Sequence, residues 1–114
     1  MEPIKFGTDG VRGKAGEWPV NSSGAYAIGL GIGRYLSQRC SQPKVLVARD
    51  TRLSGRELAE ALIKGLQESG VDTADAGVMT TPGAAHLTMR YQMSLGAVIS
   101  ASHNPWTENG IKLV

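Results

Sequence analysis

The 114-residue sequence has one cysteine, few aromatic residues and little net charge. Because Cys40 stands alone, the chain excludes an internal disulfide and any zinc site built from several cysteines. One phenylalanine, two tryptophans and three tyrosines are too few for a platform that stacks nucleic-acid bases. A formal net charge of +2 indicates neither nucleic acid nor an anionic membrane surface as a partner.

Long apolar segments are also missing. No run approaches the roughly 18 apolar residues that a bilayer-spanning helix needs, and the first residues lack the basic and then apolar pattern of a secretory signal. We therefore expect a cytoplasmic protein without membrane contact. Hydrophobic residues make up 41% of the chain and charged residues 19%, which is enough apolar content for a globular core.

Five segments have the composition of β-strands: a short one that opens residues 4–13, then residues 45–48, 73–78, 97–99 and 111–114. The runs 45–48 and 97–99 are apolar throughout, which is typical of strands that are buried on both faces. Asn109-Gly110 is a strong turn pair, so we expect the last strand to return as a hairpin.

Three segments have helical patterns: from the capping residues 21–23 to about residue 38, from Ser54 to Gly70, and from Thr81 to about Met93. Ser54 and Glu57 have the spacing of a capping box. Glycines at 29, 31 and 33 weaken the first helix by about 1 kcal/mol each relative to alanine, and we expect them to permit close packing on the sheet. Strands that alternate with helices predict a three-layer α/β/α domain with a mixed, mostly parallel sheet.

Polar residues gather where two predicted strands end. Arg49 and Asp50 follow one strand, and Ser102, His103 and Asn104 follow another. The carboxyl ends of parallel strands meet at one edge of an α/β sheet, and ligands bind there. The sequence therefore predicts a functional site at this edge.

Two glycine-rich stretches resemble nucleotide-binding motifs and fail their tests. Five residues separate Gly7 from Gly13 where a P-loop has four, and Ala15 stands where a magnesium-binding hydroxyl is needed. In the second stretch, Arg34 occupies the place of the third glycine of a dinucleotide motif, and no strand precedes it.

Three motifs together resemble the α-D-phosphohexomutase family: Phe6-Gly-Thr-Asp-Gly-Val-Arg-Gly13, Arg49-Asp-Thr-Arg-Leu-Ser-Gly55, and Ile99-Ser-Ala-Ser-His-Asn-Pro105 followed by Asn109-Gly-Ile-Lys112. The resemblance runs along nearly the whole chain but covers only the first of the family's four domains. It implies that residues 1–114 form the phosphoserine-bearing domain, truncated at its carboxyl end, with the other three domains absent. The first and third motifs are most similar to the members that act on glucosamine phosphates.

This resemblance implies an isomerase that interconverts glucosamine 6-phosphate and glucosamine 1-phosphate through a bisphosphorylated intermediate. Ser102 would hold the phosphoryl group, while Lys112, Arg12 and His103 would manage protons and charge. Each has a plainer alternative: a turn serine, an exposed edge lysine, a surface salt bridge, and a loop hydrogen-bond donor, respectively.

Other residues would support the site. Asn104, Thr8 and Asp9 would bind phosphate or substrate. Arg49 and Asp50, from their position after a strand, would form a buried ion pair that holds their own loop. Related functions remain open: a mutase for glucose or mannose phosphates, or a non-catalytic phosphosugar-binding protein of the same fold.

The resemblance also implies Mg²⁺ as a cofactor and a sugar bisphosphate as an activator, with a phosphosugar as substrate. In the family, magnesium lies between the phosphoserine and three aspartates of another domain. Asp72 and Asp75 are wrongly spaced for that role. The chain would therefore supply one ligand, the phosphate on Ser102, and we expect the isolated chain to be inactive.

Overall fold

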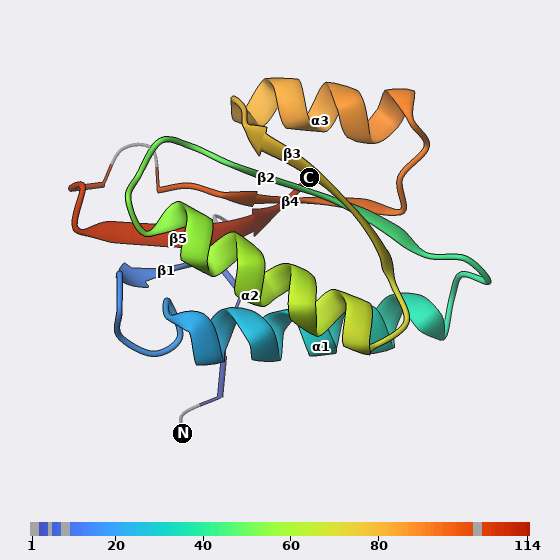
Figure 1. Cartoon of the computed structure of the whole chain (residues 1–114), viewed down its shortest axis with the longest axis horizontal. Helices are drawn as coiled ribbons and strands as arrows, with labels where there is room; N and C mark the ends of the chain where they lie inside the picture. Colours follow the sequence, from blue (N-terminus) through green and yellow to red (C-terminus); the bar gives the residue numbers. More distant parts are fainter. Residues whose placement is uncertain (1–2, 5, 8–9, 102–103) are drawn as a thin grey trace.

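The structure is a computed structural model that describes residues 3–4, 6–7, 10–101 and 104–114. Its strands are β1 (Val11–Lys14), β2 (Lys44–Arg49), β3 (Asp72–Val78), β4 (Leu95–Ile99) and β5 (Glu108–Leu113). Its helices are α1 (Ser22–Ser37), α2 (Gly55–Glu68) and α3 (Thr81–Arg90). The strands form one sheet in the order β1-β5-β4-β2-β3 (Figure 1).

Strand direction confirms the mixed, mostly parallel sheet. β2 is parallel to both β3 and β4, whereas β5 is antiparallel to β4 and to β1. Among the described strands, β5 alone therefore runs against the other four. The loop from β4 into β5 consequently lies at the carboxyl edge of the parallel strands.

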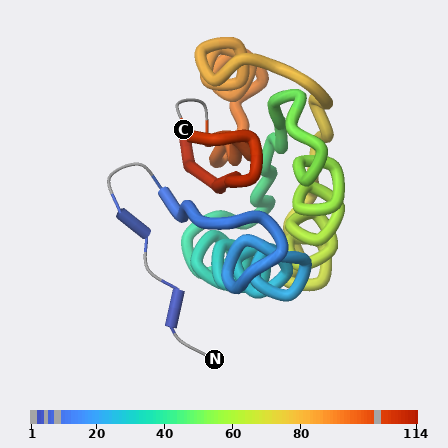
Figure 2. Tube along the Cα trace, turned by 90° about the vertical axis from the view of Figure 1, so that its left-hand side faces the viewer, coloured from blue at the N-terminus to red at the C-terminus, as the bar shows by residue number. Residues whose placement is uncertain are grey.

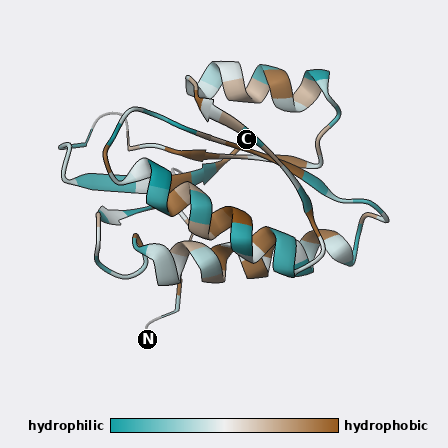
Figure 3. Ribbon diagram, in the orientation of Figure 1, coloured by the Kyte–Doolittle hydropathy of each residue, from teal (hydrophilic) through white to brown (hydrophobic). Residues whose placement is uncertain are grey.

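Helices cover both faces of the sheet, which confirms the three layers. α1 and α2 lie on one face and α3 on the other (Figures 1 and 2). Hydrophobic and hydrophilic residues alternate along α2 (Figure 3), and its buried leucines recur every four residues, at positions 58, 62 and 66. Within the described ranges, no helix is long and apolar enough to cross a membrane.

The helix starts differ from their predictions in two places. Asn21 caps α1 as expected, since its Oδ1 accepts from Gly24 N at 2.8 Å. The capping box at Ser54 is wrong: that side chain makes no capping hydrogen bond to α2, and the Glu57 carboxylate accepts from Ser22 Oγ instead. α3 is capped by Thr80, one residue earlier than expected.

The first predicted strand is also wrong. Ile4 and Phe6 lie outside every strand, and β1 starts only at Val11. Before it, Gly7 and Gly10 exchange two backbone hydrogen bonds of 3.1 Å. Gly10 has a φ of +82°, and a Cβ there would stand 2.3 Å from the Ile111 carbonyl oxygen.

Asn109-Gly110 is not the hairpin turn that its sequence predicts. Both residues are buried within β5, and the chain turns earlier, where Glu108 N donates to Pro105 O at 2.9 Å. A Cβ on Gly110 would stand 2.6 Å from the Val11 carbonyl oxygen, so the absence of a side chain here allows the close contact between β5 and β1.

Gly29 on α1 packs against α2, not against the sheet as predicted, whereas a Cβ on Gly31 would have nothing within 4 Å. A Cβ on Gly29 would stand 2.4 Å from Leu62 O, and one on Gly65 would stand 2.3 Å from Tyr26 O. The two helix backbones therefore touch at these glycines. Beside this contact Tyr26 donates to Glu68 Oε1 at 2.6 Å, and this hydrogen bond raises the pKa of the Tyr26 phenol.

This contact predicts opposite effects for two glycines of the same helix. Gly29→Ala should destabilise the fold by about 1–3 kcal/mol, because the helices must move apart. Gly31→Ala should stabilise it by up to about 1 kcal/mol, because nothing lies within 4 Å of its Cβ and alanine favours the helix. Urea unfolding of both variants measures the difference, and equal effects would contradict the contact.

Candidate functional site

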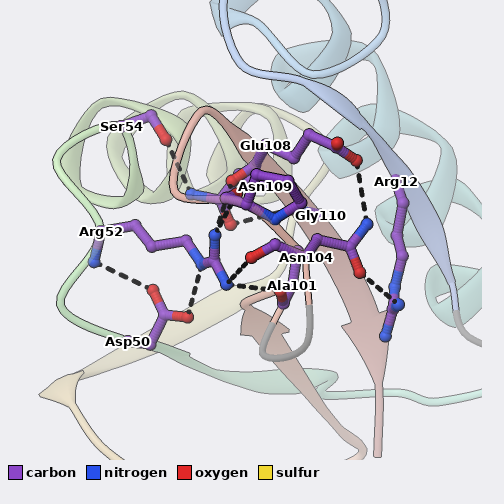
Figure 4. A network of polar contacts seen from close by, with 10 residues as sticks. Arg12, Asp50, Arg52, Ser54, Ala101, Asn104, Glu108, Asn109 and Gly110 are labelled. Atoms are coloured by element: carbon purple, nitrogen blue, oxygen red, sulfur yellow. Dashed lines mark hydrogen bonds and ion pairs between the residues drawn. The ribbon is translucent and has the colours of Figure 1, made fainter.

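Three segments that are distant in sequence meet at the carboxyl edge of the parallel strands (Figure 4). The first leads into β1, the second follows β2, and the third is the β4–β5 loop, residues 100–107. Each contains one of the three sequence motifs. The polar contacts between them define the candidate site.

Arg52 lies at the centre of these contacts. Its side chain is 13% exposed, and its Nε lies 3.2 Å from Asp50 Oδ2. The backbone N–H of Arg52 donates to the other carboxylate oxygen of Asp50 at 3.1 Å. Both oxygens of Asp50 thus hold the same residue.

The guanidinium of Arg52 also binds the β4–β5 loop through main-chain carbonyls. Nη1 donates to Pro105 O at 2.7 Å and to Glu108 O at 3.1 Å. Nη2 donates to Asn104 O at 3.0 Å and to Ala101 O. Figure 4 shows this side chain reaching from the β2 end into the loop.

A second chain of contacts joins β1 to the same loop. Arg12 Nη1 donates to Asn104 Oδ1 at 3.1 Å, and Asn104 Nδ2 donates to Glu108 Oε1 at 2.9 Å. Arg12 Nε is buried and has no hydrogen-bond partner among the described residues. One guanidinium N–H at this edge is thus available for an acceptor.

The side chain of Asn109 holds the start of β5 in place. Its side chain is fully buried, Nδ2 donates to Ser54 Oγ at 2.8 Å, and Oδ1 accepts from Gly110 N at 2.9 Å. The amide therefore ties β5 to the residue before α2. A buried carboxamide that bridges two segments in this way sets their separation.

Lys112 lies on β5 opposite Val98 and lines a cavity of about 320 Å³. Asp50 and Ser100 line the same cavity, as do residues 79–82 at the start of α3. Gly10 lies against the backbone of Lys112, since a Cβ there would be 2.8 Å from its Cα. Gly10, immediately before β1, therefore borders this lysine.

The structure brings Arg12, Asp50, Asn104 and Lys112 to one edge of the sheet, while their roles remain predictions. Four predicted residues lie outside the described residues: Thr8, Asp9, Ser102 and His103. Their roles remain predictions.

The predicted ion pair of Arg49 with Asp50 is corrected. The structure pairs Asp50 with Arg52, because the loop turns after β2 and returns the side chain two residues later. Arg49 lies beside the start of α2, where a Cβ on Gly55 would stand 3.5 Å from its Cδ.

Sequence reasoning missed Arg52, Glu108 and Asn109 as residues of the site. Arg52 lies within the second motif, and its spacing of two from Asp50 was the available signal for an aspartate that binds the backbone two residues on. For Asn109, the Asn109-Gly110 dipeptide predicts a turn and gives no sign of a buried contact. Glu108 offered no signal, since its contact with Asn104 depends on the loop's path.

The described part of the site holds the cations Arg12, Arg52 and Lys112 beside the carboxylates Asp50 and Glu108. Asp50 pairs with Arg52, Glu108 accepts from the neutral amide of Asn104, and the buried Nε of Arg12 lacks a described partner. No group of three His, Cys, Asp or Glu side chains that could hold a metal ion occurs among the described residues. These residues alone therefore do not fit a complete magnesium site.

Comparison with known proteins gives a match over nearly the whole chain. Residues 3–114 match the family model described as phosphoglucomutase/phosphomannomutase, alpha/beta/alpha domain I. Phosphoglucosamine mutase of Koribacter versatilis is 48% identical in an alignment of 114 positions that covers 98% of this chain and 25% of that protein. The same enzyme of Chromohalobacter salexigens is 48% identical in an alignment of 110 positions that covers 94% of this chain and 24% of that protein.

Solved structures agree. A putative phosphomannomutase from Thermus thermophilus superposes with a TM-score of 0.89 at 30% identity, covering 98% of this chain and 25% of that one. A phosphoglucomutase/phosphomannomutase family protein from Burkholderia thailandensis gives 0.78 at 32% identity, covering 91% and 24%. The chain thus spans about a quarter of the length of the curated relatives it matches.

The buried amide of Asn109 yields a stability prediction. Asn109→Ala should lower the free energy of unfolding by at least about 2 kcal/mol, because it leaves a hydroxyl and a backbone N–H without their partner. Ser54→Ala should cost less, and the double variant should show a coupling of about 0.5–3 kcal/mol. Urea unfolding of the four proteins measures the cycle. Strict additivity would show that the Asn109–Ser54 hydrogen bond contributes nothing.

Proposed function

The chain belongs to the phosphoglucomutase/phosphomannomutase family, and we propose that it is the phosphoserine-bearing domain of an enzyme that interconverts glucosamine 6-phosphate and glucosamine 1-phosphate. The convergence of all three motifs at one edge of the sheet is the observation that supports this most directly. The span of about a quarter of its relatives' length fits one domain of a four-domain enzyme.

In the proposed reaction, phosphorylated Ser102 donates its phosphoryl group to the free hydroxyl of the sugar monophosphate. The P–O bond to Ser102 breaks as the bond to the sugar oxygen forms, which gives a sugar bisphosphate and a free serine. The bisphosphate then returns its other phosphoryl group to Ser102, and the isomeric monophosphate leaves. Such transfers depend mainly on in-line positioning and on neutralising charge.

Residues around the serine would divide these tasks. Arg12 would use its free Nε–H on a phosphoryl oxygen, while its Nη1 stays on Asn104. Lys112 would take the proton from the attacking hydroxyl, and the cavity beside it has room for a sugar group. His103 would donate to the phosphoryl oxygens.

Three further residues would bind or orient the substrate. We propose that Asn104 contacts the phosphoryl group from the loop, and that Thr8 and Asp9 also bind phosphate or substrate. Gly10, the next residue in the sequence, lies against the backbone of Lys112, which supports this proposal.

Magnesium would require ligands beyond this chain. The described residues offer no cluster for it, so we propose that the phosphate on Ser102 is this chain's one ligand. The metal would supply charge neutralisation for the transferred group. A sugar bisphosphate would serve as activator by phosphorylating free Ser102.

Mannose or glucose phosphates are the second candidate substrates. They are favoured by the solved structures, one of which is named as a putative phosphomannomutase. Glucosamine phosphate is preferred because the relatives named for it are 48% identical, against 30–32% for those structures.

The test is a mutase assay on the full-length protein with glucosamine, glucose and mannose phosphates, Mg²⁺ and trace bisphosphate. Wild-type protein should turn over glucosamine phosphate best, and Ser102→Ala should lose at least about 10³-fold in kcat because the phosphoryl carrier is gone. Ser41→Ala, at an exposed serine away from the site, is the control. A folded full-length protein that isomerises none of the three sugars would rule out the proposal in favour of a phosphosugar-binding protein.

The 114-residue chain alone should show no turnover above buffer with any of these sugars. The reason is that its described residues provide no metal cluster and that it spans a quarter of its relatives. Adding the full-length protein to the same assay verifies the reagents. Turnover by the isolated chain would mean that it contains a complete active site.

A further inference from the structure

Arg52 uses every N–H group of its guanidinium on one loop and one carboxylate. Nε donates to Asp50, and the two terminal nitrogens donate to four main-chain carbonyls of residues 101, 104, 105 and 108. A guanidinium has five such donors in a fixed plane, so all five are occupied. We infer that Arg52 is a positioning residue for phosphoryl transfer, acting through the backbone on both sides of Ser102-His103.

The placement of the four carbonyls supports this inference. Ala101 and Asn104 are the residues immediately before and after Ser102-His103, and one nitrogen, Nη2, binds both of their oxygens. A single planar group therefore sets the separation of the Ala101 and Asn104 carbonyls. Nη1 extends the same constraint to Pro105 and Glu108, where β5 begins.

Asp50 gives the guanidinium its orientation. It accepts from the Arg52 side chain at 3.2 Å and from the Arg52 backbone at 3.1 Å. Asp50 directly follows β2, a strand with neighbours on both sides. The contact of Asp50 with Arg52 therefore fixes the position of the β4–β5 loop relative to the sheet. Asp50 N also donates to Ile99 O at 3.0 Å, which joins the end of β2 to the end of β4.

Lysine cannot reproduce this arrangement. Its ammonium has three tetrahedral donors on a flexible stem, so it cannot span four carbonyls and a carboxylate at once. Arg52→Lys thus keeps the charge and most of the bulk while removing the planar fork. This variant separates geometry from charge.

The consequence for catalysis rests on the proposed function. If Ser102 transfers a phosphoryl group in line, a displacement of its backbone by about 1 Å lowers the rate by about 100-fold, even when the substrate still binds. All five guanidinium N–H groups of Arg52 already donate to protein acceptors, so we assign it no contact with substrate. Its loss should therefore reduce kcat and leave KM nearly unchanged.

The experiment uses the full-length protein and three variants: Arg52→Lys, Arg52→Met and Arg56→Met. Arg56 is the matched control, because it is an arginine four residues away, on α2, whose guanidinium forms an exposed ion pair with Glu60. Steady-state assays give kcat and KM. Intact-protein mass spectrometry follows the single-turnover loss of phosphate from Ser102 to the sugar phosphate, and thermal unfolding reports stability.

We expect Arg52→Lys to lower kcat and the single-turnover rate by about 10–100-fold, with KM within about threefold of wild type. Arg56→Met should match wild type in each. If Arg52→Met does not fold, the lysine variant decides alone. A lysine variant that transfers phosphate at the wild-type rate, that changes only KM, or that fails to fold overturns the inference, since each assigns Arg52 a different role.

Failure of the proposed function is distinguishable from failure of this inference. If wild-type protein never gains or gives phosphate at Ser102, the proposed function falls and the role of Arg52 falls with it. If wild-type protein transfers phosphate and Arg52→Lys does so equally fast, only the role of Arg52 falls.

Discussion

The site depends on one buried cation that is satisfied by carbonyl oxygens of the main chain. Arg52 is 13% exposed and has a single carboxylate partner, Asp50, while four carbonyls accept its remaining N–H groups. A partly buried charge is tolerated only when such donors are matched. Here the matching groups all belong to one loop and the start of one strand, so satisfying the charge also fixes that loop.

Sheet topology explains why the network forms at this place. β5 reverses direction beside β4, so the β4–β5 loop lies at the edge where β2 and β3 also end. β1 then adds to the outside of β5 and brings Arg12 to the same edge. Residues separated by 92 positions, Arg12 and Asn104, become hydrogen-bonded neighbours as a result.

Much of this arrangement could be predicted from the sequence. Strand-like composition and helical periodicity identified four of the strands and the three helices, because burial dictates those patterns. Local signals failed where tertiary contacts prevail: Asn109-Gly110 reads as a turn, yet the burial of its amide against Ser54 keeps it in a strand. The contacts of Arg52 with the loop were not predictable, since main-chain carbonyls leave no trace in side-chain identity.

This last property has a consequence for how the loop can change during evolution. Every contact from Arg52 to the loop ends on a carbonyl oxygen, a group that all amino acids share. The clamp therefore does not distinguish the side chains at positions 101, 105 and 108. Exposed loop positions such as Pro105 and Trp106 can thus diversify, and with them the surface shown to a ligand, while the main-chain path is preserved. The main-chain path of this loop and the side chains that it exposes to a ligand can therefore evolve independently.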